Sequence, residues 1–216
     1  HDMLEFVGLF RSGRDRTINR DNMSMIDLIT QSEFCYNTHK FHESYSFARK
    51  AYVMDPFNSR ALLLYIACLV ELQLKTELFY LGHALVDSQS ELAWYCVGCY
   101  YWVCAQYELA QKYLKKATKL NRKLFHGWVL FGHVLAAQEE SEQAISVYRS
   151  AMRLFPGDHR PMLYMAKELS KTNFLPLALH ILLCALEMSP NDPGMLNELG
   201  VIYLKLGDID EAVEHF

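Results

Sequence analysis

A period of 34 residues constrains this chain more than any other feature of its sequence. Gly98 and Gly132 stand 34 residues apart, Gly200 follows after twice that distance, and Ala166 fills the place between them. Three further columns keep the same step: Ala110, Ala144, Ala178 and Ala212; Ala117, Ala151 and Ala185; and Pro156 with Pro190. Because independent columns agree, the sequence predicts one structural unit repeated along the chain.

Large apolar residues surround the small ones at helical spacing. Around Gly98 they are Trp94, Val97 and Tyr101, which share one face of an α-helix. The same positions around Gly132 hold Trp128, Phe131 and Leu135. No alternating pattern typical of strands competes, so each repeat is predicted to be a helix, a turn and a second helix.

The small residues indicate how the two helices pack. A glycine inside a helix costs about 1 kcal/mol relative to alanine, so its periodic return needs a compensating gain. Close approach of the second helix supplies that gain. On the second helix, the small side chains of Ala144 and Ala151 also allow the two helices to lie close together.

We expect helical repeats over 25–58, 59–90, 91–124, 125–158 and 159–192 and a partial one over 193–216. The second repeat is degenerate: it is two residues short and has Ile66 and Leu85 where small residues would stand. Residues 1–24 are interpreted as an N-terminal segment and linker, because 11–22 is charged and poor in large apolar residues. The last repeat exposes an apolar edge without a capping helix, so we expect a segment of a longer protein.

The charge and composition of the chain limit the kinds of partner that it is expected to bind. A net charge of -4 and a pI near 6.1 give no general attraction to nucleic acid or anionic lipid. The longest uncharged apolar run, 92–105, is shorter than the roughly 20 residues that span a bilayer, so no membrane is expected. The six cysteines fall mostly in apolar helical stretches and are predicted to be free thiols.

The columns match a known repeat consensus, W-x2-L-G-x2-Y followed by A-x3-F, A and P. The match is fullest in Trp128, Gly132, Ala144, Tyr148 and Ala151. In these residues the chain resembles the tetratricopeptide-repeat family. The resemblance implies an all-α fold, a right-handed superhelical α-solenoid of tetratricopeptide helical hairpins.

Five longer stretches resemble one branch of that family, the scaffold subunits of the anaphase-promoting complex of the cell-division-cycle-sixteen or Cut-nine type. They are 69–87, 97–101, 110–120, 160–169 and 189–212. The resemblance implies an architectural, non-enzymatic subunit of a multisubunit ubiquitin ligase, in the nucleus and cytoplasm. It also implies other subunits of that complex as partners, including other tetratricopeptide subunits, a homodimer through N-terminal repeats, and a small accessory subunit held in the groove.

In tetratricopeptide hairpins the first helix lines the groove through positions that alternate with the packed ones. Mapping that rule gives a mixed aromatic, apolar and polar lining suited to a peptide. For Tyr95 and Trp102, packing between repeats is an equally good interpretation, because aromatic residues at helical spacing are usually part of the core. The predicted groove residues are Tyr95, Cys99, Trp102, His126, Val129, His133, Arg160, Leu163, Lys167, Asn197 and Val201, with Ala136 and Ser170 beside them.

Other chemistries find little support. Cys96-x-x-Cys99 has a zinc-ligand spacing, but a rigid helix and the lack of a second pair argue against a metal site. No phosphate-binding loop, nucleophile motif or catalytic histidine arrangement occurs, and His39 and His42 are predicted to lie in a turn. Neither catalytic residues nor a cofactor are therefore expected.

Two other functions remain open. A peptide receptor or co-chaperone adaptor would grip a terminal carboxylate, but Lys167 and Arg160 have no lysine or asparagine partner in the preceding repeat. The targeting arm of an enzyme such as a glycosyltransferase would carry an asparagine ladder. The corresponding positions instead hold Cys96, Leu130, Tyr164 and Glu198.

Overall fold

The computed structural model describes residues 23–215, and the expected loop over 11–22 lies outside them. The chain divides into two compact units between Cys68 and Leu69. The first unit contains α2 (Met25–Asn37), α3 (Phe41–Met54) and most of α4 (Ser59–Glu71). The second contains α5 (Lys75–Val86), α6 (Glu91–Val103), α7 (Tyr107–Leu120), α8 (Phe125–Ala137), α9 (Ser141–Leu154), α10 (Arg160–Lys171), α11 (Leu175–Met188), α12 (Pro193–Leu206) and α13 (Ile209–His215).

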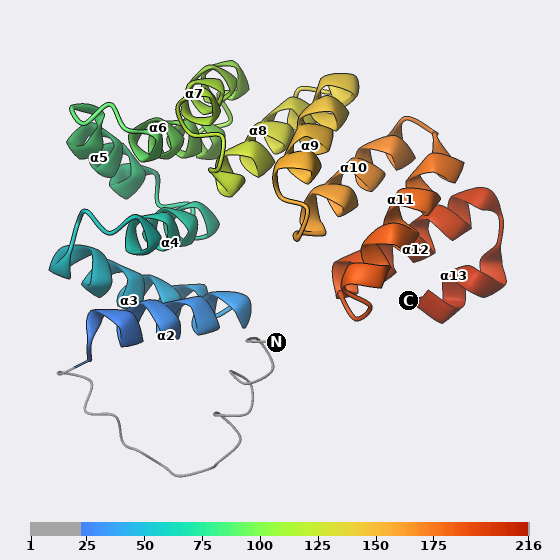
Figure 1. The fold of residues 1–216 in the computed structure, drawn as a ribbon, viewed down its shortest axis with the longest axis horizontal. Helices are drawn as coiled ribbons and strands as arrows, with labels where there is room; N and C mark the ends of the chain where they lie inside the picture. Colours follow the sequence, from blue (N-terminus) through green and yellow to red (C-terminus); the bar gives the residue numbers. More distant parts are fainter. Residues whose placement is uncertain (1–22, 216) are drawn as a thin grey trace, which may run out of the picture. The chain divides into compact units, whose positions relative to one another are not determined.

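Within each unit, neighbouring helices pack as antiparallel pairs, and in the first unit α2 packs on α3. Within the second unit, α6 packs on α7, α8 on α9, and α10 on α11 (Figure 1). No strand occurs between residues 23 and 215, so the predicted all-α fold of tetratricopeptide hairpins is confirmed. In the same range, no helix is long and apolar enough to cross a bilayer.

Each hairpin turns on one residue with left-handed backbone. Gly207 has φ 93°, and five non-glycine residues at the equivalent turns have φ between 56° and 64°. The next amide closes the turn on a carbonyl five residues earlier, as in Glu140 N to Leu135 O at 3.0 Å, so the first helix of each hairpin ends in a Schellman-type turn. His42 lies in α3, so its predicted place in the turn was wrong. The five residues are His39, Gln73, Ala105, Glu139 and Asn173.

The small residues of the second unit lie where the helices meet. Every alanine of the columns from Ala110 and Ala117 is fully buried. A Cβ added to Gly98 would lie 2.7 Å from Cγ of Leu114, and one added to Gly132 would overlap the Tyr148 ring. Close approach of the second helix over these glycines is therefore confirmed.

The first unit nests through serines instead. Ser32 in α2 and Ser44 in α3 are fully buried, and each hydroxyl donates to the other residue's carbonyl at 2.8 Å. Both stand in the register of the small columns, 66 residues before Gly98 and Ala110. Two buried hydroxyls that satisfy each other thus allow the contact that glycine and alanine allow elsewhere.

This packing predicts an unusual sign for a glycine-to-alanine change. Gly132→Ala should destabilise the chain by about 1–3 kcal/mol, because overpacking against Tyr148 outweighs alanine's better helix propensity. Gly157→Ala is the control, because its added Cβ meets nothing within 4 Å. Urea denaturation of both variants measures the effect. Equal stability of Gly132→Ala and the parent would contradict the packing.

Candidate peptide-binding groove

A groove of about 480 Å³ crosses the first helices of three successive hairpins in the second unit. Trp102 comes from α6, His133 from α8 and Lys167 from α10, so three predicted groove residues lie around one space. Tyr148 reaches the same groove from α9. The remaining lining residues are Ala136, Ala137, Tyr164, Glu168 and Lys171.

A histidine held between two tyrosines forms the centre of this groove. Tyr148 Oη lies 2.8 Å from Nδ1 of His133, and the Tyr164 ring meets the imidazole edge-on at 4.5 Å. Burial and, to a smaller extent, the positive charge of Lys167 together lower the pKa of His133 to about 4, although Glu168 opposes them. Burial raises the pKa of the Tyr148 phenol, so this hydroxyl keeps its proton. The pair is therefore neutral at physiological pH and offers a polar-aromatic surface.

Charge in the groove is arranged around a buried carboxylate. Glu168 is only 3% exposed and accepts hydrogen bonds from Lys171 Nζ at 2.6 Å and Ser141 Oγ at 3.1 Å. Lys167, one turn from Lys171, forms no ion pair with any residue in 23–215. The groove thus offers one ammonium group without a carboxylate partner beside its aromatic centre.

Three predicted groove residues are packed inside the hairpins. Tyr95 is 6%, Cys99 0% and Leu163 6% exposed, and Ser170 beside them accepts a hydrogen bond from Lys205 of α12. Their side chains fill space between repeats, which leaves little surface for a ligand. The other predicted residues are at least partly accessible: Trp102, His126, Val129, His133, Arg160, Lys167, Asn197 and Val201.

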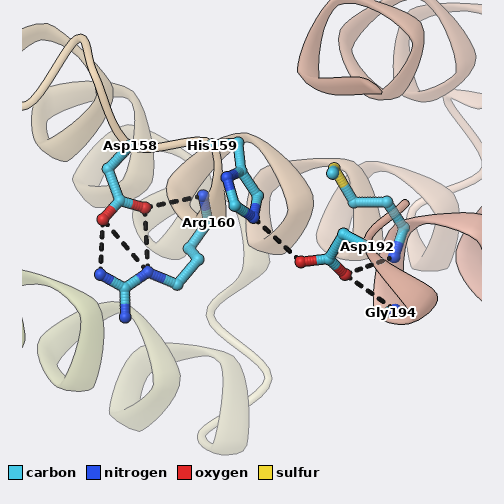
Figure 2. A network of polar contacts seen from close by, with 6 residues as sticks. Asp158, His159, Arg160, Asp192 and Gly194 are labelled. Atoms are coloured by element: carbon cyan, nitrogen blue, oxygen red, sulfur yellow. Dashed lines mark hydrogen bonds and ion pairs between the residues drawn. The ribbon is translucent and has the colours of Figure 1, made fainter. Parts of the chain in front are cut away.

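Arg160 lies at the start of α10, where polar contacts fix successive hairpins to each other. Its Nε donates to Asp158 at 2.9 Å, and its guanidinium lies 4.4 Å from the Phe125 ring of α8. The adjacent His159 reaches Asp192 at 3.0 Å, and Asp192 caps α12 through two backbone amides (Figure 2). Burial would raise the pKa of Asp192, but the bonds from His159 and those amides outweigh it and lower the pKa.

Cys96 and Cys99 in α6 are buried thiols with low reactivity. Burial raises the pKa of Cys96 to about 12 and also raises that of Cys99, which holds both as thiols. Thiolates are the species that bind zinc, so burial disfavours such a site. All six cysteines are free, and no cluster of metal-ligating side chains occurs in the described part of the chain.

Sequence reasoning missed several lining residues that belong to α10. Tyr164 and Lys171 stand three residues before and four after Lys167, so helical spacing alone places all three on one face. Tyr148 was recognised only as a consensus position, although it lines the groove. A helical-neighbour rule applied around Lys167 would have found most of the set.

Comparisons with known proteins agree with this architecture. Family models described as tetratricopeptide repeat match residues 93–124 and 164–216. The chain is 34% identical over 197 residues to the anaphase-promoting complex subunit CDC16 of Saccharomyces cerevisiae, covering 90% of this chain and 23% of that protein. It is also 34% identical over 200 residues to the human cell division cycle protein 16 homolog, covering 91% of this chain and 32% of that protein.

A solved structure gives the same result. The crystal structure of the APC/C hetero-tetramer Cut9-Hcn1 superposes with a TM-score of 0.78 at 29% identity, covering 87% of this chain and 36% of that chain. The chain is a tetratricopeptide-repeat protein. Over about nine-tenths of its own length it is a homologue of the CDC16 and Cut9 subunits of the anaphase-promoting complex, and it spans about a quarter to a third of the length of the relatives it matches.

The histidine at the centre of the groove predicts a pH-dependent stability. Its pKa is lower in the folded state, about 4, than the value near 6.5 of an unfolded chain, so the unfolded state binds the proton first. The free energy of unfolding should fall as pH drops from about 6.5 to 4, and His133→Gln should flatten that fall. Urea denaturation across this range tests it, and parallel curves for variant and parent would contradict it.

Proposed function

We propose that this chain forms part of a non-catalytic scaffold subunit of the anaphase-promoting complex, a multisubunit ubiquitin ligase. The observation that carries the proposal is similarity to CDC16 over nine-tenths of the chain. In the groove, Tyr148 Oη lies beside His133 Nδ1, but burial raises the pKa of the phenol and lowers the pKa of the imidazole, which makes a weak nucleophile next to a weak base. We also propose the nucleus and cytoplasm as its location, an expectation that comes only from the family resemblance of the sequence.

The groove across α6, α8 and α10 is proposed to hold the N-terminal segment of a small accessory subunit. A solved relative is an assembly of Cut9 with Hcn1, which supports a partner for this type of subunit. The physical support is the lining itself: Trp102 provides apolar area, His133 and Tyr148 provide hydrogen-bonding groups, and Lys167 provides a charge. Such a mixture suits a peptide bound through pockets and a few polar contacts.

Membership of the complex is tested by affinity purification of this protein from dividing cells. We expect other anaphase-promoting complex subunits, including tetratricopeptide subunits and a small accessory subunit, to copurify. Recovery of chaperones in their place would favour the co-chaperone alternative. Repeated absence of the ligase subunits from an otherwise intact purification would remove the assignment.

Peptide binding in the groove is tested separately with Trp102→Ala. A buried aromatic anchor at an interface is typically worth about 2 kcal/mol or more, so affinity for the accessory subunit's N-terminal peptide should fall about thirtyfold. Phe57→Ala is the matched control, because Phe57 is 95% exposed and lines no described groove. Isothermal titration calorimetry provides the affinities, and thermal melting verifies that both variants are folded. Equal affinity of Trp102→Ala and the parent would place the peptide elsewhere.

The dimer through N-terminal repeats also remains a proposal, carried by the resemblance to scaffold subunits. The first unit has accessible apolar side chains, among them Ile26, Val53 and Met54, which are 75%, 70% and 58% exposed. Association of two copies would remove such side chains from water and gain free energy in proportion to the apolar area buried.

A further inference from the structure

A second groove, of about 460 Å³, lies on other elements of the second unit. Its floor is α8, which contributes Trp128 and Phe131, and its walls are the C-terminal halves of α7 and α9. Lys115 and Lys119 project from α7 and Arg153 from α9, while Arg122 follows the end of α7. It shares no lining residue with the groove that contains Trp102 and His133.

The charge of this groove is opposite to that of the whole chain. The chain carries a net charge of -4, yet four cations and no carboxylate line the groove. The four side chains are exposed, and none forms an ion pair with any residue between 23 and 215. The neighbouring Lys116 differs, because its Nζ lies 3.3 Å from the centre of the Trp94 ring.

Helix dipoles explain only part of this arrangement. Lys119 and Arg153 lie in the last turns of α7 and α9, where the partial negative charge of the helix end favours a cation. Lys115 lies a turn earlier, and Arg122 lies beyond the helix. Four like charges around one concavity repel one another, so their convergence favours an anionic partner over a role in folding.

The floor of the groove distinguishes among anionic partners. Trp128 and Phe131 are half-buried apolar rings, and the indole N–H of Trp128 already donates to the Arg122 carbonyl at 3.0 Å. The floor therefore offers apolar contact area and leaves no indole donor for a phosphate. A segment with both carboxylates and an apolar side chain satisfies walls and floor together.

We propose that the groove between α7 and α9 binds an acidic peptide segment of another polypeptide, with carboxylates on the lysines and arginines and an apolar side chain on Trp128 and Phe131. This surface lies outside the groove proposed for the accessory subunit, so both could be occupied at once. The interaction is electrostatic in its walls and should weaken as ionic strength rises.

The test uses fluorescence anisotropy with the full 216-residue chain and a labelled peptide of Asp and Glu residues around one Leu. Lys119→Glu combined with Arg153→Glu should weaken binding at least tenfold. Lys40→Glu combined with Lys75→Glu changes the net charge equally at exposed sites outside both grooves and should bind like the parent. Replacing the peptide's acids by Gln and Asn, or raising the salt concentration, should each remove most of the binding.

Other results overturn the proposal. They are no binding by the parent, equal loss in both double variants, undiminished binding of the amide peptide, or tighter binding of a single-stranded oligonucleotide. If the charge-reversal variant fails to melt cooperatively, Lys119→Gln with Arg153→Gln replaces it, with a smaller loss expected. Trp102→Ala should leave acidic-peptide binding unchanged, so failure here and failure of the accessory-peptide groove are distinguishable.

Discussion

The contact between Gly132 and the ring of Tyr148 is the interaction on which the rest of the second unit depends. Because Gly132 has no side chain, α9 lies close enough to α8 for Tyr148 to cross over it. Its hydroxyl then reaches His133, the next residue along α8, at 2.8 Å. That hydrogen bond fixes the orientation of the His133 imidazole, and Tyr164 of the following hairpin contacts this ring edge-on. Helix nesting thus builds the centre of the groove as well as the fold.

The helical hairpins were predictable because small residues return at a fixed interval, and Gly98 and Gly132 each face a large side chain. The first hairpin shows the limit of that reasoning. Ser32 and Ser44 occupy the small columns, but serine is ordinarily exposed, and only their mutual hydrogen bonds reveal why they are buried. The left-handed turns could not be predicted either. Glycine usually marks such a turn in a sequence, but here residues such as Ala105 and Glu139 adopt the left-handed backbone.

The groove was partly predictable, because position within the first helix places Trp102, His133 and Lys167 toward one side. The exposure of each groove residue could not be predicted from the sequence. Cys99 and Leu163 are buried because side chains from neighbouring helices cover them. The basic groove illustrates the same limit. In the linear sequence Lys115 and Arg153 are charges on separate amphipathic helices, which usually means a solvated face. Only the packing of α7 and α9 on α8 brings them together.

One stack of hairpins therefore carries two grooves of different chemistry, one polar-aromatic across the first helices and one cationic between the second helices. The most direct test of this division is a crystal or cryo-EM structure of the chain bound to the accessory subunit's N-terminal peptide. The account predicts that the peptide lies along α6, α8 and α10, in contact with Trp102, His133 and Lys167. A peptide ordered between α7 and α9, leaving those three residues uncovered, would contradict it.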